Sequence, residues 1–140
     1  MVVETKPGLE TEEYWENLIK KSVSRYFLLG MLNERPMHGY EIAKAIEGCC
    51  EGWCKPTDGM IYPTLKELED GGYIDCASEV IGGRKRKVCQ LTPRGEGAYK
   101  AAARVWSSVL PYINSSVKNA LSDGSDGKAG CFCECEESQG

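Results

Sequence analysis

A glycine pair followed by four consecutive basic residues is the feature that most constrains the fold of this chain. Gly82–Gly83 stands immediately before Arg84–Lys87, and a glycine pair favours the tight turn of a β-hairpin. Apolar side chains alternate with polar ones on either side of the pair, near Tyr73–Val80 and Arg86–Leu91, as they do in half-buried strands. The sequence therefore predicts a β-hairpin with a basic tip.

Two short amphipathic segments precede the hairpin and predict a helix-turn-helix. The first covers about His38–Glu47, and the second begins after Thr57, a favourable N-cap residue, and ends at Asp70 before two glycines. The apolar residues of the second helix recur about one turn apart and should face the core: Ile61, Leu65 and Leu68. Tyr62 and Lys66 are then left on its exposed side.

Longer helices are predicted on both sides of this block, over about residues 10–33 and 94–121. Each carries a long apolar stripe, with Trp15 in the first and Trp106 in the last, and Pro111 should kink or divide the last helix. A small domain cannot cover two such stripes with its own middle segment. We therefore expect a homodimer in which these two helices pack against their twins.

The predicted fold class is mainly α with a small β-hairpin, a winged helix-turn-helix with long dimerisation helices over residues 1–121. A flexible, acidic, cysteine-rich tail should follow over residues 122–140. The formal net charge is −4, from 17 basic and 21 acidic residues. The charge is uneven, however, because Arg84 to Lys100 holds six basic residues and one acid. A local basic patch, rather than the overall charge, is what meets phosphates.

In such a fold the second helix of the pair can enter the major groove of double-stranded DNA while the hairpin follows the backbone. A lysine supplies a point charge, a tyrosine supplies a donor, and a helix N-terminus favours a phosphate. Seen alone, a basic run is more often a solvated turn and a helical tyrosine more often core. Their position here favours DNA binding. The candidate DNA-contacting residues are Thr57, Gly59, Tyr62, Lys66, Arg84, Lys85, Arg86 and Lys87.

Several short motifs stand out in this block: His38–Ile42, Gly59–Leu65 followed by Leu68-Glu69, Gly83–Lys87 and Leu91–Gly95. Taken together, these motifs resemble the PadR-like family of transcriptional regulators. The resemblance covers about residues 24–121 and implies a homodimeric winged-helix repressor that binds a near-palindromic operator. The sequence departs from the family pattern at Met60, where Thr or Ser is usual, and at Cys89, where Tyr is usual.

The single long helix after the hairpin resembles the short type of this family. That resemblance implies that flat aromatic compounds can bind at the dimer centre beside a Trp of the last helix, here Trp106. Trp15 on the first helix is a further candidate for the effector site or the dimer interface. A Trp in such an apolar stripe is more often plain dimer core, so both interpretations stay open at this point.

The resemblance does not account for the eight cysteines. One cluster stands just before the second helix of the pair, at Cys49, Cys50 and Cys54. Another lies in the tail, at Cys131, Cys133 and Cys135. Three thiolates suit a soft ion such as Zn²⁺, Cd²⁺, Pb²⁺ or arsenite, and an ion bound at the first cluster would shift the adjacent helix. Thiol oxidation and no role at all are the alternatives. Cys76 and Cys89, on facing strands, are expected to be buried as small hydrophobes.

No signal peptide is readable, because the N-terminus lacks a basic start and an apolar core. No membrane span is readable either, because the longest apolar run, Tyr26–Leu32, is too short to cross a bilayer. We expect a cytoplasmic protein without a membrane partner, in which a disulfide framework would be unusual. The chain shows neither a nucleophile–base pair nor an open metal site, so we do not expect an enzyme. A thiol-rich metal-binding or redox-sensing protein, whose winged helix makes only protein contacts, is the second class of function.

Overall fold

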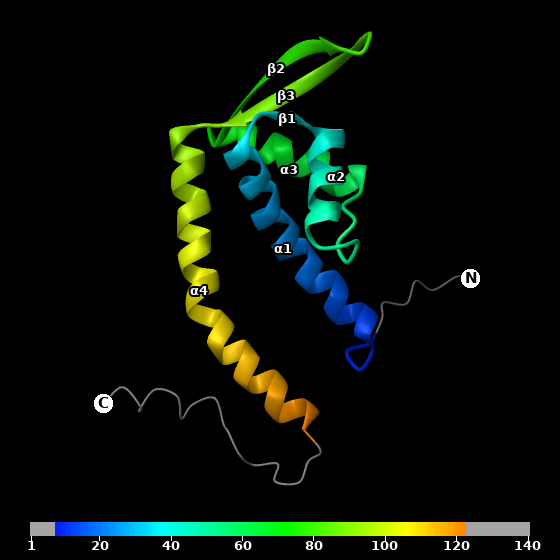
Figure 1. Cartoon of the computed structure of the whole chain (residues 1–140), viewed down its shortest axis with the longest axis vertical. Helices are drawn as coiled ribbons and strands as arrows, with labels where there is room; N and C mark the ends of the chain where they lie inside the picture. The colour runs from blue at the N-terminus through cyan, green and yellow to red at the C-terminus, as the bar shows by residue number, and fades with distance from the viewer. Residues whose placement is uncertain (1–7, 123–140) are drawn as a thin grey trace, which may run out of the picture. The chain divides into compact units, whose positions relative to one another are not determined.

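The computed structural model describes residues 8–122 of the chain, as four helices and a small sheet (Figure 1). The mainly helical winged-helix fold class is confirmed. The chain divides after Tyr99 into two compact units, a winged-helix unit and a helical segment that begins at Lys100. In chain order the elements are α1 (Glu12–Glu34), β1 (Met37–His38), α2 (Gly39–Cys49), α3 (Asp58–Asp70), β2 (Ile74–Ile81), β3 (Arg84–Leu91) and α4 (Pro93–Leu121).

The core of the winged-helix unit is formed by aliphatic side chains from the first three helices and the sheet. The inward face expected for α3 is confirmed, because Ile61, Leu65 and Leu68 are all buried. Burying an Ile or Leu side chain contributes about 1.5–3 kcal/mol each, so this face fixes how α3 is rotated about its axis. Other buried members of the core are Leu28, Leu29, Leu32, Met37, Ile42, Ile46 and Ile74.

The sheet has the strand order β1-β3-β2, and both pairings are antiparallel. The predicted hairpin is present, with strands that begin and end within two residues of the expected bounds. Gly82 and Gly83 form its turn with φ values of 60° and 80°, a left-handed backbone that glycine adopts without steric cost. β1 was not predicted, because a two-residue strand carries no periodicity.

α4 is a single helix that continues past Pro111, so of the two outcomes expected there, a kink or a division, the division is wrong. The apolar stripe of α4 from Val105 onward is largely exposed: Val105, Leu110, Ile113, Val117 and Leu121 are each at least 47% accessible. On α1, Trp15, Leu18 and Ile19 are likewise exposed. Among the described helices, none is long and apolar enough to span a bilayer.

Candidate nucleic-acid interface

The N-terminus of α3 is open to solvent. Thr57 is its N-cap, as expected, and the Thr57 carbonyl accepts hydrogen bonds from the backbone N–H groups of Met60 and Ile61, both at 2.9 Å. Within this described helix the Thr57 hydroxyl makes no capping hydrogen bond. The first N–H groups of a helix also lack intrahelical acceptors. Thr57 and Gly59, both exposed, therefore present donors that a phosphate oxygen can accept from.

Tyr62 and Lys66 lie one turn apart on the solvent side of α3. Tyr62 is 46% exposed, and its ring covers Gly39, where an added Cβ would lie 2.6 Å from the Tyr62 Cε1 and hydroxyl atoms. The Lys66 side chain is 76% exposed and its Nζ lies 3.5 Å from Asp70 Oδ2. An exposed pair of this kind contributes only ~0–1 kcal/mol, so Lys66 can exchange Asp70 for a phosphate.

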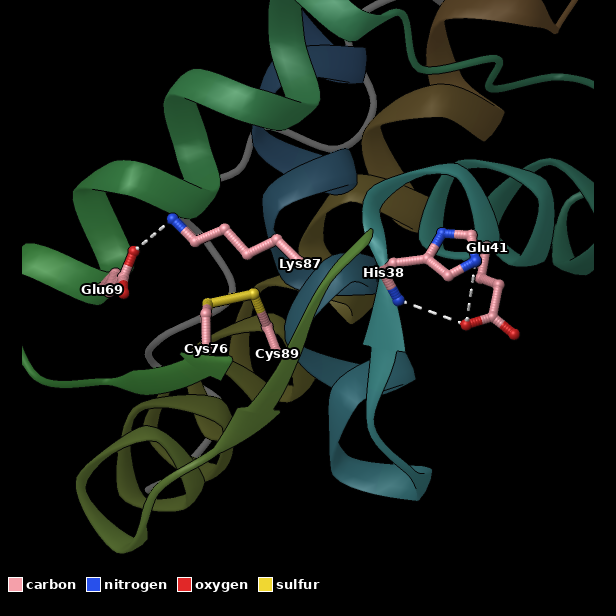
Figure 2. Close-up of a disulfide and its surroundings, with 6 residues drawn as sticks. All are labelled: His38, Glu41, Glu69, Cys76, Lys87 and Cys89. Atoms are coloured by element: carbon pink, nitrogen blue, oxygen red, sulfur yellow. Dashed lines mark hydrogen bonds and ion pairs between the residues drawn. A yellow bond between two sulfur atoms is a disulfide. The ribbon is translucent and has the colours of Figure 1, made fainter. Parts of the chain in front are cut away.

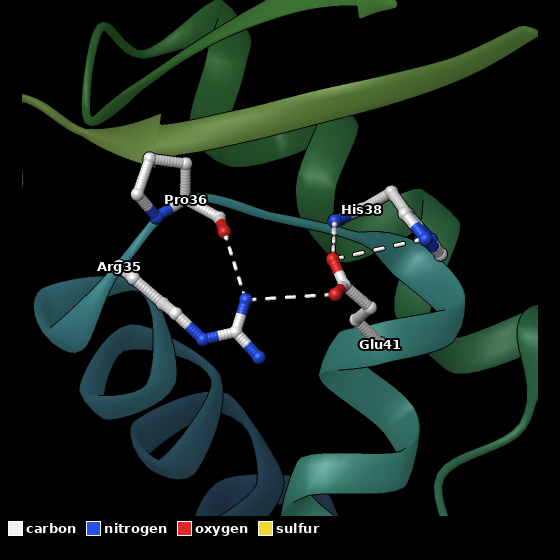
Figure 3. Close-up of polar contacts among 4 residues, drawn as sticks. All are labelled: Arg35, Pro36, His38 and Glu41. Atoms are coloured by element: carbon white, nitrogen blue, oxygen red, sulfur yellow. Dashed lines mark hydrogen bonds and ion pairs between the residues drawn. The ribbon is translucent and has the colours of Figure 1, made fainter. Parts of the chain in front are cut away.

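The start of α2 is held by the carboxylate of Glu41 (Figure 3). Glu41 Oε1 accepts a hydrogen bond from the backbone N–H of His38 at 3.2 Å, which closes a capping box. Arg35 Nη1 donates to the Pro36 carbonyl at 3.4 Å and lies 3.5 Å from Glu41 Oε2. These contacts, together with the fit of Tyr62 over Gly39, give the His-Gly-Tyr-Glu motif a structural role in setting α2 against α3.

The basic residues of the hairpin divide between its two faces. In a strand, successive side chains point to opposite sides, so Arg84 and Arg86 share one face of β3 while Lys85 and Lys87 share the other. Lys87 is already engaged, because its Nζ lies 2.9 Å from Glu69 Oε1 on α3 (Figure 2). The prediction from the sequence placed all four residues together in one basic tip. The alternation implies that a single DNA backbone meets at most one face directly.

A second link ties α3 to α1 through an ion pair. Arg25 Nη2 lies 3.0 Å from Glu67 Oε1, and Arg25 Nη1 lies 3.3 Å from Glu67 Oε2. The hydrogen bonds from Arg25, and then its positive charge, lower the pKa of Glu67. Sequence reasoning missed this pair, since the two residues are 42 positions apart and nothing local connects them.

The cysteines before α3 do not converge into a three-thiolate site. Cys54 is buried with its Sγ 2.8 Å from Ser24 Oγ, while Cys50 Sγ donates to the Ile46 carbonyl at 3.2 Å. Cys49 is exposed, and partial burial followed by the neighbouring Cys50 raises the pKa of its thiol. Within residues 8–122, no three His, Cys, Asp or Glu side chains are grouped to hold a metal ion. Cys131, Cys133 and Cys135 lie outside the described residues.

Cys76 and Cys89 are joined by a disulfide (Figure 2). The expectation that they are merely small buried hydrophobes, in a chain without disulfides, is wrong on this point. They are register partners on β2 and β3. The signal was present in the sequence, because a two-residue turn at Gly82–Gly83 pairs residues whose numbers are symmetric about it, and that rule pairs position 76 with position 89.

The two tryptophans proposed for an effector site lie on α1 and α4. Trp15 is 46% exposed, and its Nε1 donates to the Leu9 carbonyl at 2.8 Å. Trp106 is half-buried in the helical segment that begins at Lys100. Each residue therefore belongs to one of the exposed apolar stripes described above.

A helix-turn-helix followed by a hairpin with a basic tip defines the chain as a winged-helix protein. The sequence model of one family, described as "Transcriptional regulator PadR-like family", matches residues 28–101. The chain belongs to this family, whose members are transcriptional regulators rather than enzymes.

Individual relatives agree with this assignment. The Transcriptional regulator YqjI of Escherichia coli K12 is 40% identical over 71 residues, which are 51% of this chain and 33% of the relative. The chain thus spans about a third of the length of that curated relative. Among solved structures, smu.1704 of Streptococcus mutans UA159 superimposes with a TM-score of 0.61 at 26% identity, covering 70% of this chain and 89% of its own. A PadR family transcription regulator of Clostridium difficile R20291 shares the fold, with a TM-score of 0.59 at 22% identity, covering 67% and 97% of the two chains.

Proposed function

We propose that this chain is a dimeric repressor that binds a near-palindromic operator in double-stranded DNA and releases it in response to an effector. The observation that carries the proposal is the exposed pair Tyr62 and Lys66 on α3, in the same compact unit as the basic hairpin. The net charge of −4 opposes non-specific DNA binding. Binding therefore has to be concentrated on this local face.

The open end of α3 fits a major groove. Thr57 and Gly59 would meet a phosphate at the groove edge, because helix N-termini attract anions. Tyr62 and Lys66 would lie deeper, where side chains contact base edges or the opposite backbone. Of the four basic residues of the hairpin, those on one face, either Arg84 with Arg86 or Lys85 with Lys87, would follow the backbone directly, and these phosphate contacts position the protein without reading sequence.

The homodimer is supported by the exposed apolar faces of α1 and α4. Soluble monomers rarely leave large contiguous apolar patches in water, and a twofold interface would cover the same patch on both copies. Leu18 and Ile19 on α1, and Ile113 and Val117 on α4, are all between 44% and 50% exposed. A dimer of this kind sets two α3 helices about one turn of DNA apart, ~34–36 Å.

For the effector, we propose a thiophilic ion at Cys49, Cys50 and Cys54. Binding of such an ion requires two of these cysteine side chains to move. Cys54 would have to turn away from Ser24, and Cys50 away from the Ile46 carbonyl, before three sulfurs could meet one Zn²⁺, Cd²⁺, Pb²⁺ or arsenite. The segment that moves ends at Thr57, so such binding would displace the start of α3. The tail thiolates of Cys131, Cys133 and Cys135 could complete the set.

A flat aromatic effector at Trp106 is the alternative, and it is favoured by the half-buried position of that ring in an apolar stripe. The two effector classes separate in one titration. An aromatic ligand should quench tryptophan fluorescence in the natural chain and much less in a Trp106→Phe variant. The effect of a soft ion on DNA binding should be the same in Trp106→Phe as in the natural chain. That effect should be lost in a Cys49→Ser/Cys50→Ser/Cys54→Ser variant.

Sequence-specific DNA binding is tested by selecting bound duplexes from a random pool. The full chain is incubated with a pool of random duplexes, and bound DNA is amplified and sequenced, while sedimentation equilibrium gives the mass of the protein. The proposal expects a two-part, near-palindromic consensus and a dimer. A pool that gains no consensus, or a monomer at micromolar concentration, would overturn it.

A further inference from the structure

We propose that Cys76 and Cys89 form a reversible thiol–disulfide site that controls the rigidity of the wing, defined here as the β2–β3 hairpin from Cys76 to Cys89. This inference goes beyond the proposed soft-ion and aromatic effectors. It uses neither the cysteines before α3 nor those of the tail. It rests on the proposed function only where it concerns DNA affinity.

The disulfide stands at the inner end of the exposed part of the hairpin. β1 pairs with β3 only at Cys89 and Val88, so the sheet has three strands there and two strands toward the tip. On the β2 side, every residue from Ala77 to Ile81 is exposed. A two-stranded hairpin without a covered face is only marginally stable in water. The covalent link therefore closes the hairpin at the point where the third strand ends and the two-stranded part begins.

The wing is also tied to α3 on the same side. Lys87 and Cys89 point to one face of β3 because they are two residues apart, and Lys87 Nζ reaches Glu69 Oε1 at 2.9 Å. Figure 2 shows this ion pair beside the disulfide. An exposed ion pair alone holds a flexible strand weakly. When the disulfide is closed, the β3 strand that carries Lys87 is less mobile. Arg84 and Arg86, on the opposite face of the same strand, are then less mobile as well.

The two cysteines of the pair differ in exposure. Cys89 is fully buried, whereas Cys76 is partly exposed. A thiolate of an external dithiol therefore attacks the Cys76 sulfur, the Cys76–Cys89 bond breaks, and Cys89 leaves as a thiolate that takes up a proton. The second thiol of the reagent then attacks the reagent's first sulfur in the mixed disulfide, and Cys76 leaves as a thiolate that takes up a proton. Two electrons and two protons pass to the protein, and the dithiol becomes a cyclic disulfide. A low-molecular-weight disulfide such as oxidised glutathione reverses the change and leaves as two thiols.

Reduction need not unfold the hairpin. Two thiols can occupy the space of the disulfide as small hydrophobes, and the β2–β3 register stays available. What reduction removes is the covalent limit on the tip. The reduced wing must then be ordered when it binds DNA, and an ordering cost of this kind corresponds to about 3-fold to 10-fold weaker binding.

The first test does not depend on DNA. The full chain is oxidised with oxidised glutathione or reduced with dithiothreitol, the reagent is removed under argon, and brief trypsin digestion is followed by mass spectrometry. The oxidised chain should yield a linked pair of peptides containing Cys76 and Cys89. It should also be cut several-fold more slowly after Arg84–Lys87 than the reduced chain, while cleavage after Lys118 stays equal. Free Cys76 and Cys89 after oxidation, or equal wing cleavage in both forms, would overturn the proposal.

Variants separate this site from the other cysteines. Cys76→Ser, at the partly exposed position, should show the fast wing cleavage of the reduced chain under both conditions, and Cys89→Ala should behave in the same way. Cys49→Ser, at an exposed position outside the hairpin, should keep the full response. A response that persists in Cys76→Ser, or that disappears in Cys49→Ser, contradicts the assignment.

The DNA arm uses a duplex enriched by the natural chain. Its affinity should be about 3-fold to 10-fold higher for the oxidised chain than for the reduced chain, and this difference should vanish in Cys76→Ser. If no duplex can be enriched, the proposed function fails while the trypsin comparison still decides the redox site. If a duplex is enriched and both forms bind it equally, the redox control of binding is wrong and the proposed function stands.

Discussion

The ring of Tyr62 on α3 lies directly over the Cα of Gly39 at the start of α2. A Cβ at position 39 would stand 2.6 Å from both Cε1 and the hydroxyl oxygen of Tyr62, well inside van der Waals contact. The same tyrosine is a candidate DNA contact. Gly39 therefore sets how deeply α3 seats against α2, and with it the direction in which Tyr62 is presented.

We expect Gly39→Ala to destabilise the fold by about 0.5–1.5 kcal/mol, because the added methyl group forces the end of the half-exposed Tyr62 side chain away from its rotamer. The Tyr62 ring must move, so DNA affinity should fall as well. Gly48→Ala is the matched control in the same helix, since a Cβ there meets no atom within 4 Å. It should be neutral or stabilising by up to ~1 kcal/mol. Urea unfolding followed by circular dichroism measures both; equal effects would contradict this packing argument.

Lys66→Ala and Arg84→Ala should each weaken binding to duplex DNA and reduce its dependence on salt. Each lost phosphate contact lowers the slope of log affinity against log salt by about 0.9. Lys118→Ala removes the same charge in the last turn of α4 and should leave the slope unchanged. Fluorescence anisotropy of a labelled duplex at several salt concentrations gives the slopes. Identical slopes for all three variants would remove Lys66 and Arg84 from the interface.

The side-chain carboxyl of Glu67 should titrate below the range usual for glutamate. Hydrogen bonds from Arg25 are the main cause of its lowered pKa, followed by the Arg25 charge. A carboxyl whose pKa is depressed in the folded state favours folding above its unfolded pKa and loses that contribution as pH falls through the folded value. Carboxyl NMR titration of natural chain and Arg25→Gln should show a higher midpoint for Glu67 in the variant. An unchanged midpoint would mean that the pair is not formed in solution.

Opening the disulfide should also lower the free energy of unfolding. The link closes a loop with a sequence separation of 13, and a loop of this length corresponds to about 3 kcal/mol in the chain-entropy description. Oxidised natural chain should therefore unfold at a higher urea concentration than Cys76→Ser, while reduced natural chain should resemble the variant. Coincident curves for oxidised and reduced chain would show that the link is absent or carries no stabilisation.

Local patterns in the sequence were enough to predict much of this fold. The spacing of Ile61, Leu65 and Leu68 gave the buried face of α3, and glycines at 82 and 83 gave the turn of the hairpin. These features depend on neighbours in sequence. The register that pairs Cys76 with Cys89 was also readable, but the expectation of a reducing compartment argued against a disulfide.

Other features depend on tertiary contacts that no local pattern encodes. The pair between Arg25 and Glu67 spans 42 positions, and the cover of Gly39 by Tyr62 needs α2 and α3 already packed. Cys54 illustrates the same limit. Its spacing from Cys50 suggested a shared metal site, whereas its side chain turns into the core toward Ser24.

The most direct test of the account is a hydroxyl-radical footprint of the full chain on its enriched duplex. Two copies of α3 in successive major grooves should give two protected zones on one face of the DNA, with centres about 10–10.5 base pairs apart. Flanking backbone protection should be lost selectively when Arg84 and Arg86 are replaced by alanine. A single protected zone, or flanks that are unchanged in that variant, would contradict a dimer that binds through α3 and the wing.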